Sequence, residues 1–129
     1  MLTVLIVDDE PNIVELVRVT LEDDHVRVVI AVDAETALAR AAEARPDLIL
    51  LDVQLPDRSG LEVCRLLRRD PRFTRTRIVM LTAASQQADV GRGLAAGADV
   101  YLTKPFSPVR LLALVDSLFP HETLWVREP

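Results

Sequence analysis

Five short apolar runs alternate with helix-like segments along the chain, and this alternation restricts the fold more than any other feature of the sequence. The runs cover residues 2–7, 26–32, 48–51, 78–81 and 100–102. They are nearly continuous in Val, Ile and Leu, which is typical of strands buried on both faces of a sheet. Strand and helix in regular alternation predict an α/β fold, in which a five-stranded parallel sheet carries helices on both faces.

The segments between the runs carry helix start and stop signals. Apolar spacing predicts helices over residues 11–21, 34–44, 59–68, 86–95 and 107–119. Asp33 and Ser107 are suited to cap helices, and Pro11 and Pro108 fit the first turns that follow such caps. Gly97 is a natural left-handed terminator of the fourth helix. Five helices are therefore expected beside five strands.

Length and charge limit the class of protein. A chain of 129 residues, half of them apolar, fits one domain, which we expect to cover residues 1–119 and to leave residues 120–129 as a tail or the start of a linker. A net charge of −5 argues against nucleic-acid binding, which needs clustered cations. There is no apolar run of membrane-spanning length and no signal peptide, so we expect a cytoplasmic protein.

Chemically active side chains follow four of the predicted strands. Asp8 and Asp9 follow the first strand, Asp52 the third, Thr82 the fourth and Lys104 the fifth. The carboxyl ends of parallel strands meet at one edge of the sheet, where such folds bind ligands. Crowded carboxylates repel one another, so a cation must offset them. Lys104, the one lysine of the chain, supplies one charge, and oxygen ligands with open water positions suit Mg²⁺.

Each of these residues alone has an ordinary structural explanation. Asp9 can be a helix cap, Thr82 can close a strand, and Lys104 can be a solvated surface charge. Asp52 is harder to explain in this way because a buried strand delivers it. A functional site is indicated by the combination: two strands end in acidic residues, a third in a hydroxyl group and a fourth in an ammonium group.

Four stretches of the chain resemble the receiver domain of two-component response regulators, the chemotaxis-type phosphoacceptor family. They are VDDEP (7–11), LLDVQLPDRSG (50–60), LTA (81–83) and GADVYLTKPF (97–106), in the order and spacing of that family. The resemblance implies a doubly wound, flavodoxin-like three-layer sandwich with strand order 2-1-3-4-5. It also implies that Lys104 and Pro105 are joined by a cis peptide bond.

The same resemblance implies roles for individual residues. Asp52 would accept a phosphoryl group, with Lys104 and Thr82 binding its oxygens. Asp8, Asp9, the Asp52 carboxylate and the backbone carbonyl of Gln54 would hold Mg²⁺, with Mn²⁺ as an alternative ion. The family's switch residues would be Thr82 and Tyr101, which moves inward when Thr82 is drawn toward the phosphoryl group.

Partners follow from the resemblance as well. The donor would be a phosphohistidine on a sensor histidine kinase or a phosphotransfer protein, and the output would reach an effector protein or domain. The surface formed by residues 86–95, 100–102 and 107–119 is a candidate for that output and for a homodimer. We expect this domain to bind neither nucleic acid nor a membrane.

Three other classes are weighed against this interpretation. Phosphohydrolases with an aspartate nucleophile carry a second acid two positions later, where this chain has Gln54. An FMN carrier on the same fold would meet acids where it needs a hydroxyl-rich loop. A receiver that works without phosphorylation would not need Asp52, Thr82 and Lys104 together. We therefore expect a phosphoacceptor that assists its own phosphorylation and dephosphorylation and is not an independent enzyme.

The fourth predicted helix contains Gly91 and Gly93, each of which costs ~1 kcal/mol relative to Ala inside a helix. One hypothesis is that the resulting weakness lets phosphorylation reposition this helix. The alternative is that glycine permits close packing. Amide hydrogen exchange distinguishes the two.

Overall fold

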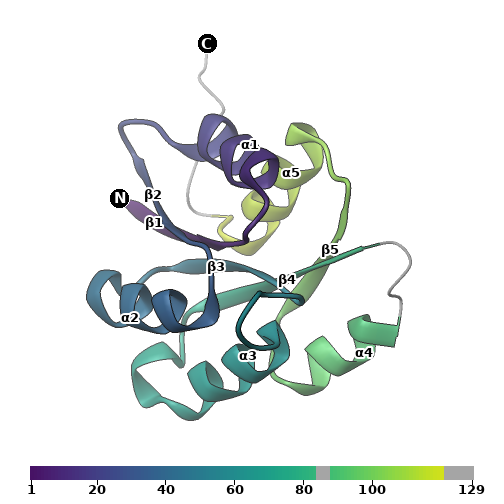
Figure 1. Ribbon diagram of the computed structural model, residues 1–129. Helices are drawn as coiled ribbons and strands as arrows, with labels where there is room; N and C mark the ends of the chain where they lie inside the picture. Colours follow the sequence, from purple (N-terminus) through teal and green to yellow (C-terminus); the bar gives the residue numbers. More distant parts are fainter. Residues whose placement is uncertain (84–87, 121–129) are drawn as a thin grey trace.

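The computed structural model describes residues 1–83 and 88–120 of the chain. It contains five parallel strands in the order β2-β1-β3-β4-β5, as expected for a doubly wound sheet (Figure 1). The strands are β1 (Leu2–Val7), β2 (Val26–Ala31), β3 (Leu48–Asp52), β4 (Arg77–Ala83) and β5 (Val100–Lys104). The helices are α1 (Pro11–Leu21), α2 (Ala34–Ala44), α3 (Gly60–Arg69), α4 (Ala88–Ala95) and α5 (Pro108–Leu118), with a short 3-10 turn, η1 (Pro71–Phe73).

The helices form two layers on opposite faces of the sheet. Figure 1 shows α1 and α5 on one face and α2, α3 and α4 on the other. Alternate residues of β1 serve the two layers: Leu5 and Val7 join the core under α2 and α3, while Val4 and Ile6 join the core under α1 and α5. The predicted three-layer sandwich is confirmed, and the central strands β1 and β3 are mostly apolar and buried because both faces of the sheet are covered.

The helix caps agree with the sequence prediction. The side chain of Asp33 accepts a hydrogen bond from the N–H of Thr36 at 2.8 Å, and Ser107 does the same for Arg110 at 3.1 Å. Gly97 has a φ of 108°, the left-handed conformation expected of a residue that terminates a helix. The peptide bond between Lys104 and Pro105 is cis, as the family resemblance implies.

Strand and helix ends differ from the prediction by a few residues. β4 extends to Ala83 and β5 to Lys104, because hydrogen-bonded pairing continues past the apolar run into the polar residues that follow. Within the described residues α4 begins at Ala88, and the predicted start at Gln86 lies outside them. The segment η1 was not predicted. Trp125 and the rest of the predicted tail from residue 121 onward also lie outside the described residues.

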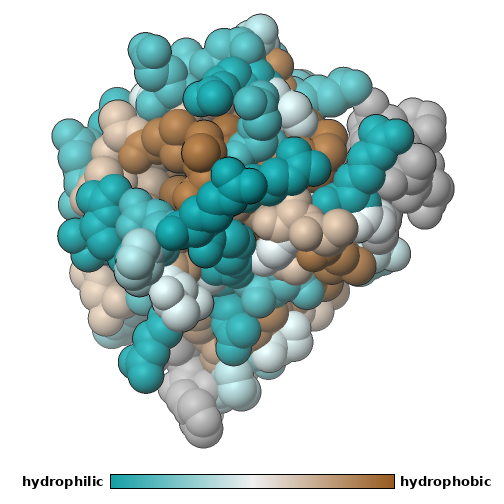
Figure 2. All heavy atoms as spheres, turned by 90° about the horizontal axis from the view of Figure 1, so that it is seen from below, coloured by the Kyte–Doolittle hydropathy of each residue, from teal (hydrophilic) through white to brown (hydrophobic). Residues whose placement is uncertain are grey.

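The surface seen from below in Figure 1 is mixed, with hydrophilic side chains separating smaller hydrophobic patches (Figure 2). Exposed apolar side chains include Leu66 on α3 and Leu94 on α4, which are 39% and 46% exposed. Isolated apolar residues of this kind are ordinary on soluble domains. Among residues 1–83 and 88–120, the search for a helix long and apolar enough to cross a bilayer finds none.

Candidate functional site

The register of the sheet brings the acidic strand ends together. Val7 of β1 is paired with Leu51 of β3, so the residues that follow, Asp8 and Asp52, leave neighbouring strands at the same level. Parallel strands lie about 4.8 Å apart, which places their terminal side chains within reach of one another. Asp8 is fully buried and Asp52 is 7% exposed. The sequence prediction that these two carboxylates converge is confirmed.

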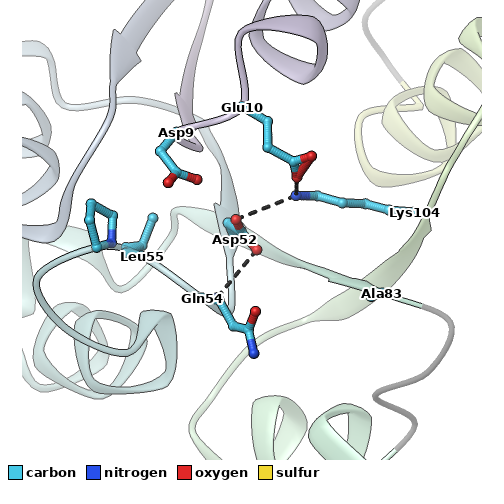
Figure 3. Close-up of a pocket in the computed structure, with 8 residues that line it drawn as sticks. Asp9, Glu10, Asp52, Gln54, Leu55, Ala83 and Lys104 are labelled. Carbon is cyan, nitrogen blue, oxygen red and sulfur yellow. Dashed lines mark hydrogen bonds and ion pairs between the residues drawn. The ribbon is translucent and has the colours of Figure 1, made fainter.

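Lys104 reaches this pair of carboxylates from the far side of β4. It ends β5, which is two strands from β3 and three from β1. The residue paired with it on β4 is Ala83, whose small side chain leaves room for the lysine to pass. Figure 3 shows Lys104 extending from β5 toward Asp52 and Glu10. A long, flexible, compact cation suits this path better than a planar guanidinium.

The Lys104 ammonium group contacts three carboxylates. Its Nζ lies 2.8 Å from Asp8 Oδ2, 2.7 Å from Glu10 Oε1 and 3.4 Å from Asp52 Oδ2. The contact with Asp8 lacks hydrogen-bond geometry, since Asp8 Oδ2 accepts no hydrogen bond from any described residue. We therefore treat it as an ion pair. Three negative charges surround one positive charge, so the ionised cluster carries two negative charges in excess.

This environment changes the pKa values of the buried acids. Burial raises the pKa of Asp52 to about 6, and the charge of Asp8 adds to the rise. Lys104 and the N–H of Gln54, 3.2 Å from Asp52 Oδ1, oppose that rise. Burial also raises the pKa of Asp8 above its usual value, against the influence of Lys104. Both carboxyl groups are therefore harder to ionise than ordinary aspartates.

Lys104 responds in the opposite way. Burial alone would lower the pKa of its ammonium group, but the interactions with the Asp8 and Glu10 carboxylates outweigh burial and raise that pKa above its ordinary value. The side chain is 13% exposed. Lys104 therefore stays charged across the physiological pH range, and it remains a permanent cation beside Asp52.

A hollow of about 390 Å³ opens over this cluster, and Asp9, Glu10, Asp52, Gln54, Leu55, Pro56, Ala83 and Lys104 line it. Asp9 lies on the side of the hollow opposite Lys104 (Figure 3). Asp9 and Glu10 are exposed in this lining, and Asp52 is buried in it. A small anion or a cation with its water ligands fits a space of this size and chemistry.

The donor set fits a hard divalent cation. Carboxylate oxygens of Asp8, Glu10 and Asp52 all lie within 4.8 Å of one another. Asp8 Oδ2 is a buried oxygen that pairs with Lys104 and accepts no hydrogen bond from the described residues, and a carboxylate oxygen has a second lone pair with which it can also contact a metal cation. Oxygen ligands of this kind are those that Mg²⁺ prefers, and a divalent charge would offset the excess of two negative charges.

Glu10 is the member of the cluster that the sequence analysis did not assign. Its side chain is 57% exposed and occupies the N-cap position of α1 without making a side-chain cap hydrogen bond. Instead it binds Lys104, while its own N–H donates to Asp8 Oδ1 at 2.9 Å. The sequence feature that could have identified Glu10 is its position directly after Asp8 and Asp9. Asp9, which was assigned as a ligand, lines the hollow but is outside the close carboxylate group.

Thr82 and Tyr101 lie next to the site rather than in it. Thr82 is 2% exposed, and its hydroxyl makes a long hydrogen bond of 3.4 Å to the carbonyl oxygen of Ala83. Tyr101 is 39% exposed and lines a separate groove between β5 and α5, together with Arg110 and Leu114.

Comparison with a family model gives a match over most of the chain. Residues 4–116 match the model described as "Response regulator receiver domain". The match includes every strand and helix listed above except the first two residues of β1 and the last two of α5.

Two curated relatives carry names from transcriptional regulation. The DNA-binding response regulator MtrA of Mycolicibacterium smegmatis is 43% identical over 112 residues, which are 87% of this chain and 48% of MtrA. The alkaline phosphatase synthesis transcriptional regulatory protein PhoP of Bacillus subtilis is 45% identical over 115 residues, 89% of this chain and 47% of PhoP. The chain thus spans about half the length of these relatives.

Among solved structures, the chemotaxis response regulator CheY4 of Vibrio cholerae is similar over nearly its whole length. The TM-score is 0.85 at 37% sequence identity, covering 92% of this chain and 98% of CheY4. The sequence match and the fold thus agree on one family.

Proposed function

The chain belongs to the family of response regulator receiver domains of two-component systems, and from this premise we propose that Asp52 is its phosphoacceptor. The observation that carries the proposal is the contact of one lysine with the buried carboxylates at the ends of β1 and β3. Asp52 is the acid that is both buried and part of the lining of the hollow, so an incoming phosphoryl group can reach it.

The protonation state of Asp52 suits a nucleophile. With a pKa of about 6, its carboxyl group is mostly ionised at neutral pH and more basic than an ordinary aspartate. One carboxylate oxygen attacks the phosphorus of a phosphohistidine on the partner. A P–O bond to Asp52 forms while the P–N bond breaks, and the imidazole leaves with the electron pair of that bond and takes up a proton.

Lys104 and the acids prepare the site for that transfer. Lys104 Nζ lies 3.4 Å from Asp52 Oδ2, so it can pair with an oxygen of the group that joins this carboxylate. To do so it must loosen its contact with Glu10, which lies 2.7 Å away. Thr82, buried near the end of β4, would provide a second hydrogen bond to the phosphoryl group through its hydroxyl.

Mg²⁺ is the cation we propose for this site, with Mn²⁺ as an alternative, and the residues that would hold it are Asp8, Asp9, Asp52 and the backbone carbonyl of Gln54. The bound ion would neutralise charge on the transferring phosphoryl group. The closeness of the Asp8 and Asp52 carboxylate oxygens supports these two ligands, and the position of Asp9 and Gln54 in the lining of the hollow supports the other two. Glu10 lies near enough to contribute through water.

The protein is a signalling domain, and in this proposal it assists its own phosphorylation and dephosphorylation without turning over a substrate. Gln54, two residues after Asp52, lines the hollow where aspartate-nucleophile hydrolases carry a second acid. Its amide group is not acidic, so it cannot act as the general acid that such hydrolases place there, and we expect no turnover of a substrate.

Partners and organisation follow from the family. A histidine kinase or phosphotransfer protein supplies the phosphoryl group in the cytoplasm, and an effector protein or domain reads the result. The output face is α4, β5 and α5, through a partner or a second copy of the chain, and Tyr101 on its exposed strand reports the state of Thr82. The receiver domain extends over residues 1–119, with residues 120–129 as tail or linker.

Intact mass spectrometry tests this function directly. The chain is incubated with Mg²⁺ and phosphoramidate, which donates a phosphoryl group without a kinase. The wild type and the matched control Asp116→Asn, an exposed acid on α5, should each gain one phosphoryl group, and Asp52→Asn should gain none. Labelling of Asp52→Asn at the wild-type level, or absence of labelling of the wild type, would overturn the proposal.

A further inference from the structure

A carboxylate outside the acidic cluster ties the loop between β3 and α3 to a different helix. Asp57 lies in this loop, five residues after Asp52. Its Oδ1 accepts a hydrogen bond from the N–H of Ala34 at 2.8 Å, and its Oδ2 accepts one from the N–H of Glu35 at 3.1 Å. These partners are the first two residues of α2. One side chain therefore joins the loop beside the site to a helix end more than 20 residues away in the sequence.

The start of α2 explains why the tie forms. The first N–H groups of a helix have no partner within the helix and carry a partial positive charge. Asp33, the N-cap residue, satisfies the N–H of Thr36, which leaves the N–H groups of Ala34 and Glu35 for Asp57. The Ala34 N–H is also the main cause that holds the pKa of Asp57 below its usual value. Asp57 is therefore ionised where it accepts the hydrogen bonds from the start of α2.

The base of the loop is fixed separately. The N–H of Gly60 donates to the carbonyl oxygen of Val53 at 2.7 Å, and Gln54 forms an antiparallel bridge with Ser59. Gly60 also packs directly on the backbone of Asp52, where any Cβ would collide with the Asp52 carbonyl oxygen. The loop is thus a narrow hairpin, and Gln54 lies on its side that faces the hollow.

The tip of the hairpin has few other anchors. Leu55 packs partly against the core, and Arg58 forms an exposed ion pair with Glu62 of the following helix at 3.5 Å. At the tip of the loop, residues 55–58, the described polar contacts that reach an element other than β3 and α3 are those of Asp57, whereas at its base the N–H of Val53 donates to the carbonyl oxygen of Leu81 on β4. A hairpin held at its base and at one point of its tip can pivot only when that point is released.

We propose that Asp57 is a positioning residue for the cation site: by fixing the loop tip on α2, it holds the Gln54 backbone in place beside Asp52. The inference rests on the proposed function, because Gln54 is one of the residues assigned to the cation. Asp57 touches neither the hollow nor the cluster, so it acts through the loop backbone. Residues that orient metal ligands from outside the coordination shell typically change metal affinity about 10- to 100-fold when removed.

Three variants of the full chain separate this role from simple helix stability. Asp57→Ala removes both bonds to α2, and Asp57→Asn keeps one acceptor oxygen. Asp33→Ala is the matched control, because it removes a carboxylate cap from the same helix end without touching the loop. Far-UV circular dichroism first establishes that each variant is folded. Isothermal titration calorimetry then gives the dissociation constant for Mg²⁺.

We expect Asp57→Ala to raise the Mg²⁺ dissociation constant about tenfold, at the lower end of the range for such residues. Asp57→Asn should lie between this variant and the wild type, and Asp33→Ala should match the wild type. With phosphoramidate, Asp57→Ala should need more Mg²⁺ for half-maximal phosphorylation but reach the wild-type rate at saturation. If Asp57 only stabilised α2, both Ala variants would be less stable, but Asp57→Ala would not show weaker Mg²⁺ binding together with an unchanged rate at saturating Mg²⁺.

The two ideas fail in different ways. If the wild type binds Mg²⁺ and Asp57→Ala binds it as tightly as Asp33→Ala does, the positioning role is wrong and the proposed function stands. If the wild type binds no Mg²⁺, or Asp52→Asn does not alter its binding, the proposed function itself is wrong.

Discussion

Lys104 determines the balance of charge at the site because its single ammonium group contacts three carboxylates. Two of these carboxylates, Asp8 and Asp52, are buried, so their charges cannot be stabilised by bulk water. The cluster is therefore strained in the absence of a cation. Because a bound cation would reduce the repulsion between these carboxylates, cation binding should stabilise the folded chain.

Asp52→Asn should make the cation-free protein more stable at pH 7, by about 2–3 kcal/mol. The pKa of Asp52 rises from 3.8 to about 6 on folding, so the folded chain binds the proton more tightly than the unfolded chain. Ionisation of Asp52 therefore costs stability above pH 6, and the cost disappears as the pH falls toward 4. Urea unfolding in EDTA, repeated across this pH range, measures the difference between the two proteins.

Asparagine stands in for the protonated carboxyl group, so the advantage of Asp52→Asn must shrink as the pH falls from 7 to 4. A difference that does not change with pH would contradict the raised pKa. A variant less stable than the wild type at pH 7 would contradict the repulsion between the carboxylates.

Lys104→Met should have the opposite effect. It removes the cation while keeping most of the apolar stem, so buried Asp8 and Asp52 lose their partner. Removing one member of a buried charge group costs about 3 kcal/mol at the lower end of measured cases. Arg40→Met, an exposed change on α2, should alter stability by less than about 0.5 kcal/mol. Urea unfolding compares the three proteins, and equal stability of both variants would refute a central role for Lys104.

At the scale of secondary-structure elements, α4 is the helix whose two glycines have different surroundings. A Cβ on Gly93 would lie 2.9 Å from Cγ of Met80, so glycine there permits close packing on β4. A Cβ on Gly91 would meet nothing within 4 Å. Close packing therefore accounts for Gly93, and Gly91 is the residue that weakens the helix without a packing reason.

Gly91→Ala should consequently stabilise the protein by about 0.5–1 kcal/mol, the usual gain from replacing an exposed helical glycine. Gly93→Ala should show no such gain, because the methyl group must displace Met80. Chemical denaturation gives both values. The hydrogen-exchange rates of the α4 amides should exceed those of α3 in the wild type and fall in Gly91→Ala. Amides of α4 as protected as those of α3 would remove the case for a loosely held helix.

For the molecule as a whole, the sequence was sufficient to predict the sheet, its helices and most of the site. Short continuous apolar runs between helical segments indicate buried parallel strands, and the carboxyl ends of such strands lie at one edge of the sheet, which is why Asp8, Asp9, Asp52 and Lys104 were predicted to meet. Asp9 is the one of these four that lies outside the close group. Contacts between side chains far apart in the sequence were harder to predict. Glu10 belongs to the cluster because its exposed side chain turns toward Lys104. Asp57 binds α2 across 23 residues of sequence. The spacing of apolar residues predicts neither contact.

Mg²⁺ should raise the melting temperature of the whole domain. An ion that binds the folded chain and not the unfolded one adds RT ln(1 + [Mg²⁺]/Kd) to the free energy of unfolding, which is about 2.7 kcal/mol at 100 times Kd. Differential scanning calorimetry at increasing MgCl₂ measures the shift, with matched KCl as the control for ionic strength. Equal shifts in the two salts would show general screening and no cation site.

Chemical trapping of the acyl phosphate identifies the residue that accepts the phosphoryl group. Borohydride reduces an aspartyl phosphate to homoserine, so the chain is phosphorylated with phosphoramidate and Mg²⁺, reduced, digested and sequenced by tandem mass spectrometry. The account predicts homoserine at position 52, dependent on Mg²⁺. Homoserine at position 8 or 9 instead, or a phosphorylated chain without any homoserine, would contradict it.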